Sequence, residues 1–329
     1  MLKTFQIFHQ NNFAWSFHVG KEAHMLHIIY NPMSSSGNGS KVFEQTQAAL
    51  DRENIEYRVY ETTGQGSAKR YAKDITSDEF NDKIVVIGGD GTLNEVFNGI
   101  KDYSKATIGY IPSGSGGDFA RDLGISTDPS KAIEAVIHTK EYKMMDVGNL
   151  TNAECNKRFC VSAGIGFDAA VCHEALHSRL KVILNKFHLG KLTYLLIAIK
   201  QILTTQKHGC TLILDDARKI TFDHFYFVTT MIHRYEGGGF MFCPNAKCDD
   251  GIIDICVAGN LSKLKVLTII PKALKGKHVN CKGISIYSAR KVQVISDEKL
   301  PVHADGEYAG VEDELVVTQC DKQIRVAVR

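Results

Sequence analysis

One aspartate stands among three glycines where the sequence changes from strand-like to helix-like. Apolar residues 84–87 precede the loop, and helix-like sequence follows from about Leu93. The loop consists of Gly88, Gly89, Asp90, Gly91 and Thr92. Glycines let a backbone approach a phosphate closely, and free N–H groups at a helix start provide positive potential. An aspartate there would repel phosphate unless it held Mg²⁺ or its water shell, so the loop predicts a metal–nucleotide site. The alternative is a tight turn with a helix cap at Thr92.

A second pair of acids, Asp305 and Glu307, lies near the end of the chain in the segment HADGE. If this segment is extended, positions i and i+2 point to the same face, and both carboxylates converge on one site. Phosphoryl transfer to an alcohol requires in-line positioning, Mg²⁺ and a carboxylate that accepts the hydroxyl proton. The alternative is a β-hairpin turn, because Asp-Gly is a favoured turn pair.

The first half of the chain alternates short apolar strands with helix-like sequence. Strands are predicted at 26–31, 56–60, 83–89 and 107–112, with a helix near 41–52. This alternation predicts a parallel sheet covered by helices on both faces. Ligands of such sheets bind at the carboxyl ends of the strands, and the glycine-rich loops fall at those ends.

After about residue 146 the sequence is mostly strand-like, apart from a helical stretch near 170–205. Strands are predicted at 211–216, 220–232, 252–259, 283–288, 291–296 and 314–319. Runs of strands after an α/β region indicate a mostly antiparallel β-sandwich domain. We therefore expect an N-terminal extension (1–24), an α/β nucleotide-binding domain (25–145) and a β-rich domain (146–329). The last residues are candidates to return to the first domain.

These motifs together resemble the diacylglycerol kinase catalytic-domain family, in particular the bacterial soluble lipid kinases. The resemblance rests on GGDGTLNEVFNG at 88–99, on Asn31-Pro32 with the loop MSSSGNG, on PSGSGGDFAR at 112–121 and on the late DGE at 305–307. It extends from about residue 26 to the end. The GGDGT core also occurs in NAD kinases, and a related GGDGS in phosphofructokinases, so the other motifs favour a lipid acceptor.

The resemblance implies an α/β domain like those of phosphofructokinases and NAD kinases, with ATP and Mg²⁺ as cofactors. The residues that it implies for the nucleotide are Asn31, Pro32, Ser35, Ser36, Gly37, Thr62, Gly88, Gly89, Asp90, Gly91, Thr92, Leu93, Asn94, Glu95, Gly114 and Ser115. Thr63 is the alternative to Thr62. Asp90 would hold the active-site Mg²⁺, directly or through water. Glu307 would be the proton acceptor, and Asp305 would orient the network around it.

The segment CPNAKCDDGIID, 243–254, is similar to the part of the family that holds a structural Mg²⁺. By position, Asp250 would give its side chain, while Lys247 and Ile252 would give main-chain oxygens. An Asp-Gly turn before a strand is the alternative. Two departures from the family pattern lie in the segment 112–121. Ser115 replaces a threonine and keeps the hydroxyl, whereas Gly117 replaces an asparagine and removes a side-chain amide that would grip the nucleotide.

Charge is distributed unevenly along the 329 residues, whose net charge is +2. Residues 1–146 hold 15 basic and 19 acidic side chains, and residues 147–329 hold 24 and 18. Segments 175–214 and 255–296 contain no acid at all. Such basic runs can attract an anionic membrane surface, and the amphipathic stretch 179–207 is a candidate for that contact. The alternatives are a solvated basic face and two ordinary helices packed on the β domain.

We expect a cytoplasmic protein with peripheral membrane contact. The nine cysteines contain no CxxC motif and indicate reduced thiols, and no apolar run approaches the ~20 residues that span a bilayer. Nucleic-acid binding is not expected, because the basic runs lack interleaved stacking aromatics. A homodimer is compatible with the sequence.

The predicted function is ATP-dependent phosphorylation of a lipid hydroxyl, with diacylglycerol, which would give phosphatidic acid, as the favoured acceptor. A sphingoid base, ceramide or a polyprenol would require the same chemistry. An NAD kinase is a more distant alternative, which would need neither the Asn31-Pro32 loop nor the late DGE. A non-catalytic lipid- or nucleotide-binding module is a further alternative, although Asp90, Asp305 and Glu307 are all intact.

Overall fold

The computed structural model describes residues 25–35, 37–77, 83–114, 117–177, 197, 199–206 and 208–328. These residues form two compact units. The first unit extends to Met144 and also contains the C-terminal segment from Ile324, and the second comprises Met145–Gln323. The predicted residues Ser36 and Ser115, the extension 1–24 and most of the basic stretch 179–207 lie outside the described residues.

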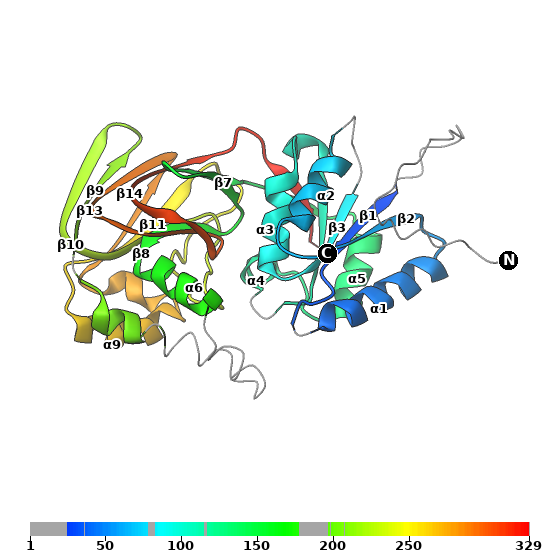
Figure 1. The fold of residues 1–329 in the computed structure, drawn as a ribbon, viewed down its shortest axis with the longest axis horizontal. Helices are drawn as coiled ribbons and strands as arrows, with labels where there is room; N and C mark the ends of the chain where they lie inside the picture. Colours follow the sequence, from blue (N-terminus) through cyan, green and yellow to red (C-terminus); the bar gives the residue numbers. More distant parts are fainter. Residues whose placement is uncertain are drawn as a thin grey trace. The chain divides into compact units, whose positions relative to one another are not determined.

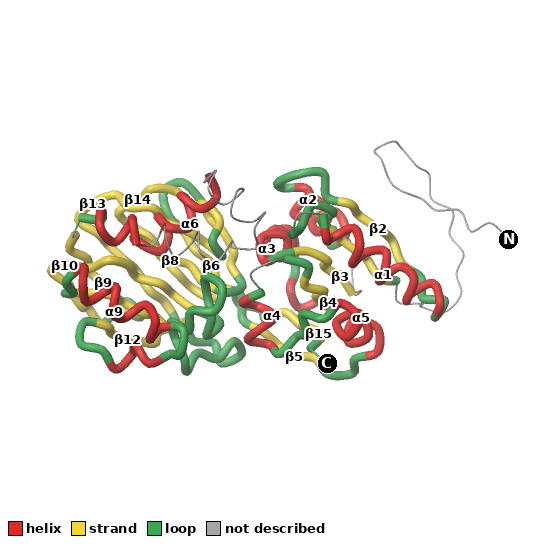
Figure 2. Tube along the Cα trace, turned by 90° about the horizontal axis from the view of Figure 1, so that it is seen from below, coloured by secondary structure: helices red, strands yellow, loops and turns green. Residues whose placement is uncertain are grey.

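The first unit is built on a six-stranded sheet in the order β2-β1-β3-β4-β15-β5 (Figures 1 and 2). Its strands are β1 (Leu26–Tyr30), β2 (Tyr57–Glu61), β3 (Lys83–Gly88), β4 (Thr107–Pro112), β5 (Tyr142–Met145) and β15 (Ile324–Ala327). The pairs β1–β2, β1–β3, β3–β4 and β4–β15 are parallel. Strand β15 brings the end of the chain back into this sheet.

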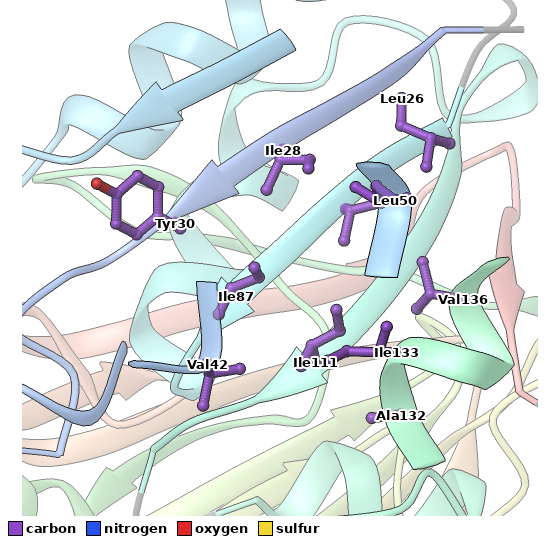
Figure 3. Packing of buried hydrophobic residues seen from close by; sticks show 11 residues of the cluster. Leu26, Ile28, Tyr30, Val42, Leu50, Ile87, Ile111, Ala132, Ile133 and Val136 are labelled. Atoms are coloured by element: carbon purple, nitrogen blue, oxygen red, sulfur yellow. The ribbon is translucent and has the colours of Figure 1, made fainter. Parts of the chain in front are cut away.

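Helices cover both faces of this sheet. They are α1 (Asn38–Arg52), α2 (Ser67–Ile75), α3 (Asp90–Gly99), α4 (Asp118–Leu123) and α5 (Pro129–His138). Alternate residues of β1, β3 and β4 face α1 and α5, because side chains along a strand alternate between its two faces. Figure 3 shows this core, in which Ile28, Ile87 and Ile111 lie between the strands and Leu50 of α1. On the other face, Tyr110 of β4 meets Phe119 of α4 edge to face.

The second unit consists mainly of a nine-stranded antiparallel sheet. Its strands are β6 (Gly148–Thr151), β7 (Asn156–Phe159), β8 (Ser162–Gly166), β9 (His208–Leu214), β10 (Arg218–Met231), β11 (Ile253–Gly259), β12 (Ile284–Ala289), β13 (Lys291–Ala304) and β14 (Glu307–Gln319). Its described helices include α6 (Phe167–His177) and α9 (Lys263–Ala273). These observations confirm the predicted fold class.

Two long strands fold this second sheet over on itself. The first halves of β10 and β13 both pair with β9, and their second halves both pair with β8. Register shifts interrupt β10 between Phe222 and Phe225 and β13 between Ile295 and Leu300. Irregularities of this kind bend a strand and increase its twist, so one strand can serve two parts of a curved sheet.

Helices α2 and α3 pack closely at Gly99, so this position gives a test of the fold. A Cβ there would lie 2.2 Å from the carbonyl oxygen of Lys69 on α2. We expect Gly99→Ala to lower the free energy of unfolding by roughly 1–3 kcal/mol, although alanine favours helices, because the two helices must separate. Chemical denaturation would measure the change. Gln45→Ala on the exposed side of α1 is the control and should cost no more than a few tenths of a kcal/mol. Equal stability of the two variants would contradict this packing.

Candidate functional site

The loops that follow the parallel strands gather at one edge of the first sheet. Each loop begins with a backbone hydrogen bond to a neighbouring strand or its end: Asn31 N to Ile87 O, Thr62 N to Tyr30 O and Ser113 N to Gly88 O, all 2.9 Å. The loops after β1, β2, β3 and β4 therefore lie side by side at the carboxyl ends. This confirms the predicted placement of the glycine-rich loops.

Two of these loops touch through glycine backbones. A Cβ on Gly114 would lie 2.5 Å from the Cα of Gly89, and a Cβ on Gly88 would lie 2.7 Å from the Cβ of Thr92. A side chain at 114 would therefore force these two loops apart, and a side chain at 88 would displace Thr92 in its own loop. The glycines are needed for this close approach of backbone to backbone, and glycine backbone of this kind also lets a phosphate approach closely.

Asp90 is the first residue of helix α3, and its carboxylate joins two loops. Its Oδ2 accepts a hydrogen bond of 2.9 Å from the N–H of Gly117. Gly117 has φ of +70° and stands directly before helix α4, a left-handed conformation that glycine adopts without strain. Glycine at this departure from the family pattern therefore suits the backbone, and its N–H contacts the motif aspartate directly.

Hydroxyl and amide groups connect the Asn31 loop to the other two. Asn31 Nδ2 donates to Thr92 Oγ1 at 3.2 Å, and Asn31 Oδ1 accepts from Met33 N. Ser34 Oγ and Ser113 Oγ share a buried hydrogen bond of 2.6 Å. Ser34 and Ser113 were not among the predicted site residues, since nothing in the sequence separates a serine that supports the loop from one that faces a ligand.

Glu95 holds the loop after β2. Its two carboxylate oxygens accept the N–H groups of Gly66 at 2.8 Å and Ala68 at 3.1 Å. These donors lie at the start of helix α2, which has no side-chain cap of its own. Glu95 thus acts as a cap supplied from another helix, and the negative charge suits the positive end of α2.

Most of the predicted nucleotide residues are therefore neighbours along one edge of the first sheet. Helix α3 begins at Asp90 rather than at about Leu93, three residues earlier than predicted, so the motif aspartate is part of the helix. The alternative of a cap at Thr92 is wrong: the N-cap is Gly89, and Thr92 Oγ1 contacts Asn31. Whether these groups bind a nucleotide stays a prediction.

The expected extended conformation at Asp305 is wrong. Strands β13 and β14 pair Ala304 with Glu307, so Asp305 and Gly306 form a two-residue hairpin turn. Both have positive φ, +51° and +78°, as the common Asp-Gly hairpin turn requires. Asp305 and Glu307 therefore do not project from one face of a strand. The hairpin that sequence reasoning kept as the alternative is the structure that forms.

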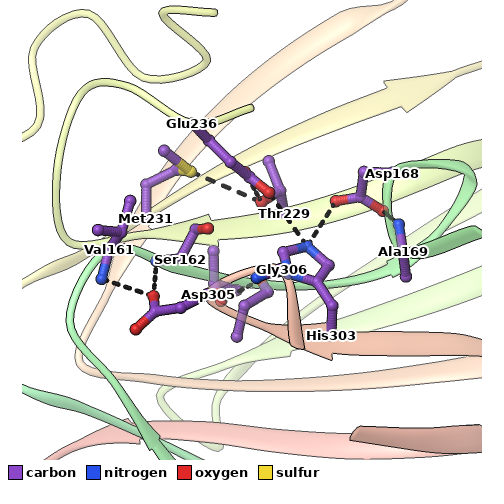
Figure 4. A network of polar contacts seen from close by, with 12 residues as sticks. Val161, Ser162, Asp168, Ala169, Thr229, Met231, Glu236, His303, Asp305 and Gly306 are labelled. Carbon is purple, nitrogen blue, oxygen red and sulfur yellow. Dashed lines mark hydrogen bonds and ion pairs between the residues drawn. The ribbon is translucent and has the colours of Figure 1, made fainter. Parts of the chain in front are cut away.

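The carboxylate of Asp305 is an acceptor for the backbone between β7 and β8 (Figure 4). Its oxygens accept the N–H groups of Cys160 and Val161 at 2.8 Å and of Ser162 at 3.0 Å. The N–H of Asp305 in turn donates to Ser162 O at 2.8 Å. Three N–H donors hold this carboxylate in one orientation. Asp305 therefore fastens the turn in which it lies to the start of β8.

A buried cluster that the sequence did not predict lies beside this turn: Asp168, Glu236 and His303. His303 Nε2 is 3.3 Å from Asp168 Oδ2 and 3.2 Å from Glu236 Oε1 (Figure 4). The three residues are at most 8% exposed. They come from the start of α6, the loop after β10 and the end of β13. No spacing in the sequence connects them, because only the pairing of β8 with β10 and β13 brings them together.

Burial alone would lower the pKa of His303, but the carboxylates of Glu236 and Asp168 and the charge of Asp305 outweigh it and raise this pKa to about 9. The other ring nitrogen, Nδ1, accepts the N–H of Gly306 at 3.2 Å. A lone pair is therefore required at Nδ1, which places the ring hydrogen on Nε2, facing the carboxylates. The proton that is bound more tightly therefore belongs to the Nε2 side of the cluster, where the ring and the two carboxylates share it, and Nδ1 keeps its lone pair.

A metal ion is the other occupant that these residue types could suit, since a histidine and two carboxylates lie within 4.8 Å of one another. A histidine that binds a metal through Nε2 carries its hydrogen on Nδ1 and donates it to an acceptor. Here Nδ1 faces a donor, Gly306 N–H. The geometry therefore indicates a hydrogen-bonded cluster and not a metal site.

The predicted metal segment lies in a loop before β11. Asp250 is exposed, and its Oδ1 accepts the N–H of Ile252 at 3.1 Å, which closes a short turn. The buried Asp146 supports this loop by accepting the N–H of Gly251 at 2.8 Å. Burial raises the pKa of Asp254, and the charge of Asp250 adds to this shift. Asp250 and the main-chain oxygens of Lys247 and Ile252 stay the predicted ligands at this turn, and oxygen ligands of this kind suit a hard cation such as Mg²⁺.

The second unit also contains a pocket of about 410 Å³. Apolar side chains form much of its wall, among them Phe167, Phe225, Tyr226, Leu300 and Pro301. Glu174 lines the same pocket and binds Lys200 at 2.6 Å, so this lysine of the basic stretch is paired within the protein. The pocket is wide enough for part of an apolar chain.

Comparison with known proteins agrees with this geometry. Residues 25–150 match the diacylglycerol kinase catalytic domain, and residues 161–326 match the YegS C-terminal NAD kinase beta sandwich-like domain. Over 286 residues the chain is 30% identical to a diacylglycerol kinase of Bacillus subtilis, covering 86% of this chain and 90% of that one. The chain belongs to the diacylglycerol kinase-like lipid kinase family. The protein is therefore a kinase.

Two further relatives of this lipid kinase span nearly the same length. This chain is 30% identical over 288 residues to YtlR of Bacillus subtilis, and the match covers 86% of this chain and 93% of YtlR. The crystal structure of a diacylglycerol kinase from Bacillus anthracis superposes with a TM-score of 0.72 at 24% identity, covering 93% of this chain and 97% of that one. This last likeness concerns the fold alone. Among the described residues of the kinase, no helix is both long and apolar enough to cross a membrane.

The His303 cluster predicts how the stability of this lipid kinase depends on pH. A pKa that is raised in the folded state adds stability below the ordinary value of about 6.5, and this stability is lost as pH rises through about 9. We expect the free energy of unfolding to fall across that interval, and Glu236→Gln to reduce the fall by roughly 1 kcal/mol. Urea unfolding at several pH values would measure it. Glu298→Gln, an exposed change on the same strand as His303, should leave the wild-type slope; an equal slope in Glu236→Gln would contradict the cluster.

Proposed function

We propose that the protein transfers the γ-phosphate of ATP to the hydroxyl group of a membrane lipid, with diacylglycerol as the favoured acceptor. The observation that supports it most is the array of loops at the carboxyl ends of β1, β3 and β4. Bare glycine backbone, the N-terminus of α3 and a half-buried aspartate meet there. That combination suits a metal-bound polyphosphate, and one relative named above, at 30% identity, is a diacylglycerol kinase.

Each part of the array has a proposed role. The N–H groups around Gly88, Gly89 and Gly114 would cradle phosphate oxygens, and Asn31 with its loop would border them. Asp90 would orient Mg²⁺ or the water around it, which supplies charge neutralisation for the transferred group. Gly117 N–H already fixes one oxygen of Asp90, so the carboxylate is oriented before any ligand arrives.

In the second unit, Glu307 is proposed as the acceptor of the lipid hydroxyl proton. It is half-buried and is the first residue of β14, directly after the anchored turn. Asp305 is fully used by backbone N–H groups and supports the turn. The apolar pocket between α6, β10 and β13 supports a substrate with a hydrocarbon chain. Contact of the protein with an anionic membrane surface is part of the same proposal, and its acid-free basic segments favour it.

One experiment tests the class of acceptor. The pure protein is incubated with γ-labelled ATP, Mg²⁺ and mixed micelles that contain diacylglycerol, a sphingoid base, ceramide or a polyprenol, with NAD as the soluble control. We expect label in phosphatidic acid. Label in another lipid would keep the chemistry and correct the acceptor, whereas label in NAD alone, or in nothing, would reject a lipid kinase acting on these substrates.

Glu307→Gln tests the proton acceptor. The amide keeps the shape of the side chain but cannot take a proton, so we expect kcat to fall at least roughly 100-fold, while the Kd for Mg–ATP stays within a few-fold. Steady-state kinetics and nucleotide titration measure the two quantities. Asp313→Asn removes a charge from an exposed site on the same strand and is the control. A kcat in Glu307→Gln equal to that of the control would remove Glu307 from the reaction.

Asp250→Ala tests the structural Mg²⁺. If the turn at 247–252 binds the ion, added Mg²⁺ should raise the Tm of the wild-type protein and of the neighbouring control Asp249→Ala, but not that of Asp250→Ala. Differential scanning calorimetry with and without a chelator gives the shifts. Should Asp250→Ala show the full Mg²⁺-dependent shift, the ion binds elsewhere.

A further inference from the structure

The imidazole of His303 connects two features that the sequence places far apart. Its Nε2 faces the buried carboxylates of Asp168 and Glu236, and its Nδ1 accepts the N–H of Gly306 in the hairpin turn. Gly306 is the residue directly before Glu307. The ring therefore lies between a fixed ionic cluster and the backbone that presents the proposed proton acceptor (Figure 4).

The tautomer follows from the partners. Because Gly306 N–H points at Nδ1, the lone pair must be on that nitrogen, and the hydrogen must be on Nε2. Two carboxylate oxygens at 3.2 and 3.3 Å stabilise a hydrogen at Nε2. The carboxylates thus select the one neutral form of the ring that can accept from the turn. A carboxylate that sets the tautomer of a histidine for the histidine's other partner is a recurring device in protein sites.

The cluster is built to hold this geometry. Asp168 Oδ1 accepts Ala169 N at 2.8 Å, and Glu236 Oε2 accepts Thr229 Oγ1 at 3.0 Å, so the second oxygen of each carboxylate is also fixed. Gly164 on β8 leaves room for the contact. A Cβ there would lie 2.3 Å from Asp168 Oδ2 and 2.8 Å from His303 Nε2.

We propose that His303 is a positioning residue for the transfer reaction: Asp168 and Glu236 fix its tautomer so that it binds Gly306 N–H and sets the backbone at Glu307. The inference rests on the proposed role of Glu307. In this arrangement both residues of the turn are anchored: Asp305 accepts the N–H groups of 160–162, and Gly306 donates its N–H to the ring of His303. His303 itself does not touch the substrate in this proposal.

Two substitutions of His303 test the roles of the two ring nitrogens one at a time. His303→Asn places an amide oxygen near the position of Nδ1, so it can still accept Gly306 N–H but loses the contact with the carboxylates. His303→Gln places an amide nitrogen near the position of Nε2, so it can still donate to a carboxylate but loses the bond to the turn. The matched controls are His224→Asn and His224→Gln at an exposed histidine of the same unit.

Amide hydrogen exchange of Gly306 tests the contact without any assay of activity. We expect exchange to be at least tenfold faster in His303→Gln than in the wild-type protein, and His303→Asn to retain most of the protection. The His224 variants should match the wild-type protein. Unchanged protection of Gly306 in His303→Gln would overturn the hydrogen bond and, with it, the proposal.

Kinetics then test positioning. We expect kcat to fall roughly 10- to 100-fold in His303→Gln, with KM for ATP little changed, and to fall less in His303→Asn. Equal losses in both variants, in proportion to their losses of stability, would indicate a structural role only and reject the proposal. Loss of Gly306 protection with a normal kcat would also reject it. Absence of lipid phosphorylation in the wild-type protein would instead reject the proposed function, while the exchange data would still report on the ring and the turn.

Discussion

Backbone N–H groups in the loops at the strand ends need acceptors, and the acids of the sequence motifs supply many of them. A buried donor without a partner costs free energy comparable to a lost hydrogen bond, so such acceptors decide which loop conformations are stable. Four carboxylates act in this way on loops far from them in sequence: Asp90 on Gly117, Glu95 on Gly66 and Ala68, Asp146 on Gly251, and Asp305 on residues 160–162.

This use of acids explains why the site is a set of bare loops with fixed side chains. Asp90 and Glu95 bind the N–H groups of neighbouring loops through their carboxylates, and Gly89 and Gly114 approach each other backbone to backbone beside them. A carboxylate that accepts N–H groups is held in one orientation, and an oriented carboxylate is also what binding a metal requires. Fixing a loop and binding a metal thus both favour a carboxylate, and Asp90 is placed where it fixes a loop and is also the predicted metal ligand.

Local patterns in the sequence were enough to predict β1 to β4 of the six-stranded first sheet and the loops that follow them. Four compact apolar strands, each followed by helix-like sequence, predicted β1 to β4 and the edge at which the glycines meet. The segment 142–166 was not predicted to contain β5 to β8, because those strands are only four or five residues long and mix polar with apolar side chains. The Asp168–Glu236–His303 cluster could not be predicted either. Its members meet only through the antiparallel pairing of β8 with β10 and β13, and a single sequence does not show that pairing.

The hairpin at 305–306 places the two acids of the DGE motif in different structural environments. In an extended strand, the side chains of Asp305 and Glu307 would point to the same face. Instead, a two-residue turn reverses the chain here, so Asp305 lies in the turn and Glu307 begins β14. Three N–H donors occupy the carboxylate of Asp305, so this side chain is committed to the backbone of residues 160–162. Glu307 is half-buried and begins the next strand. The turn therefore assigns Asp305 to fixing the backbone, and Glu307 is the acid of this motif for which a role as proton acceptor is proposed.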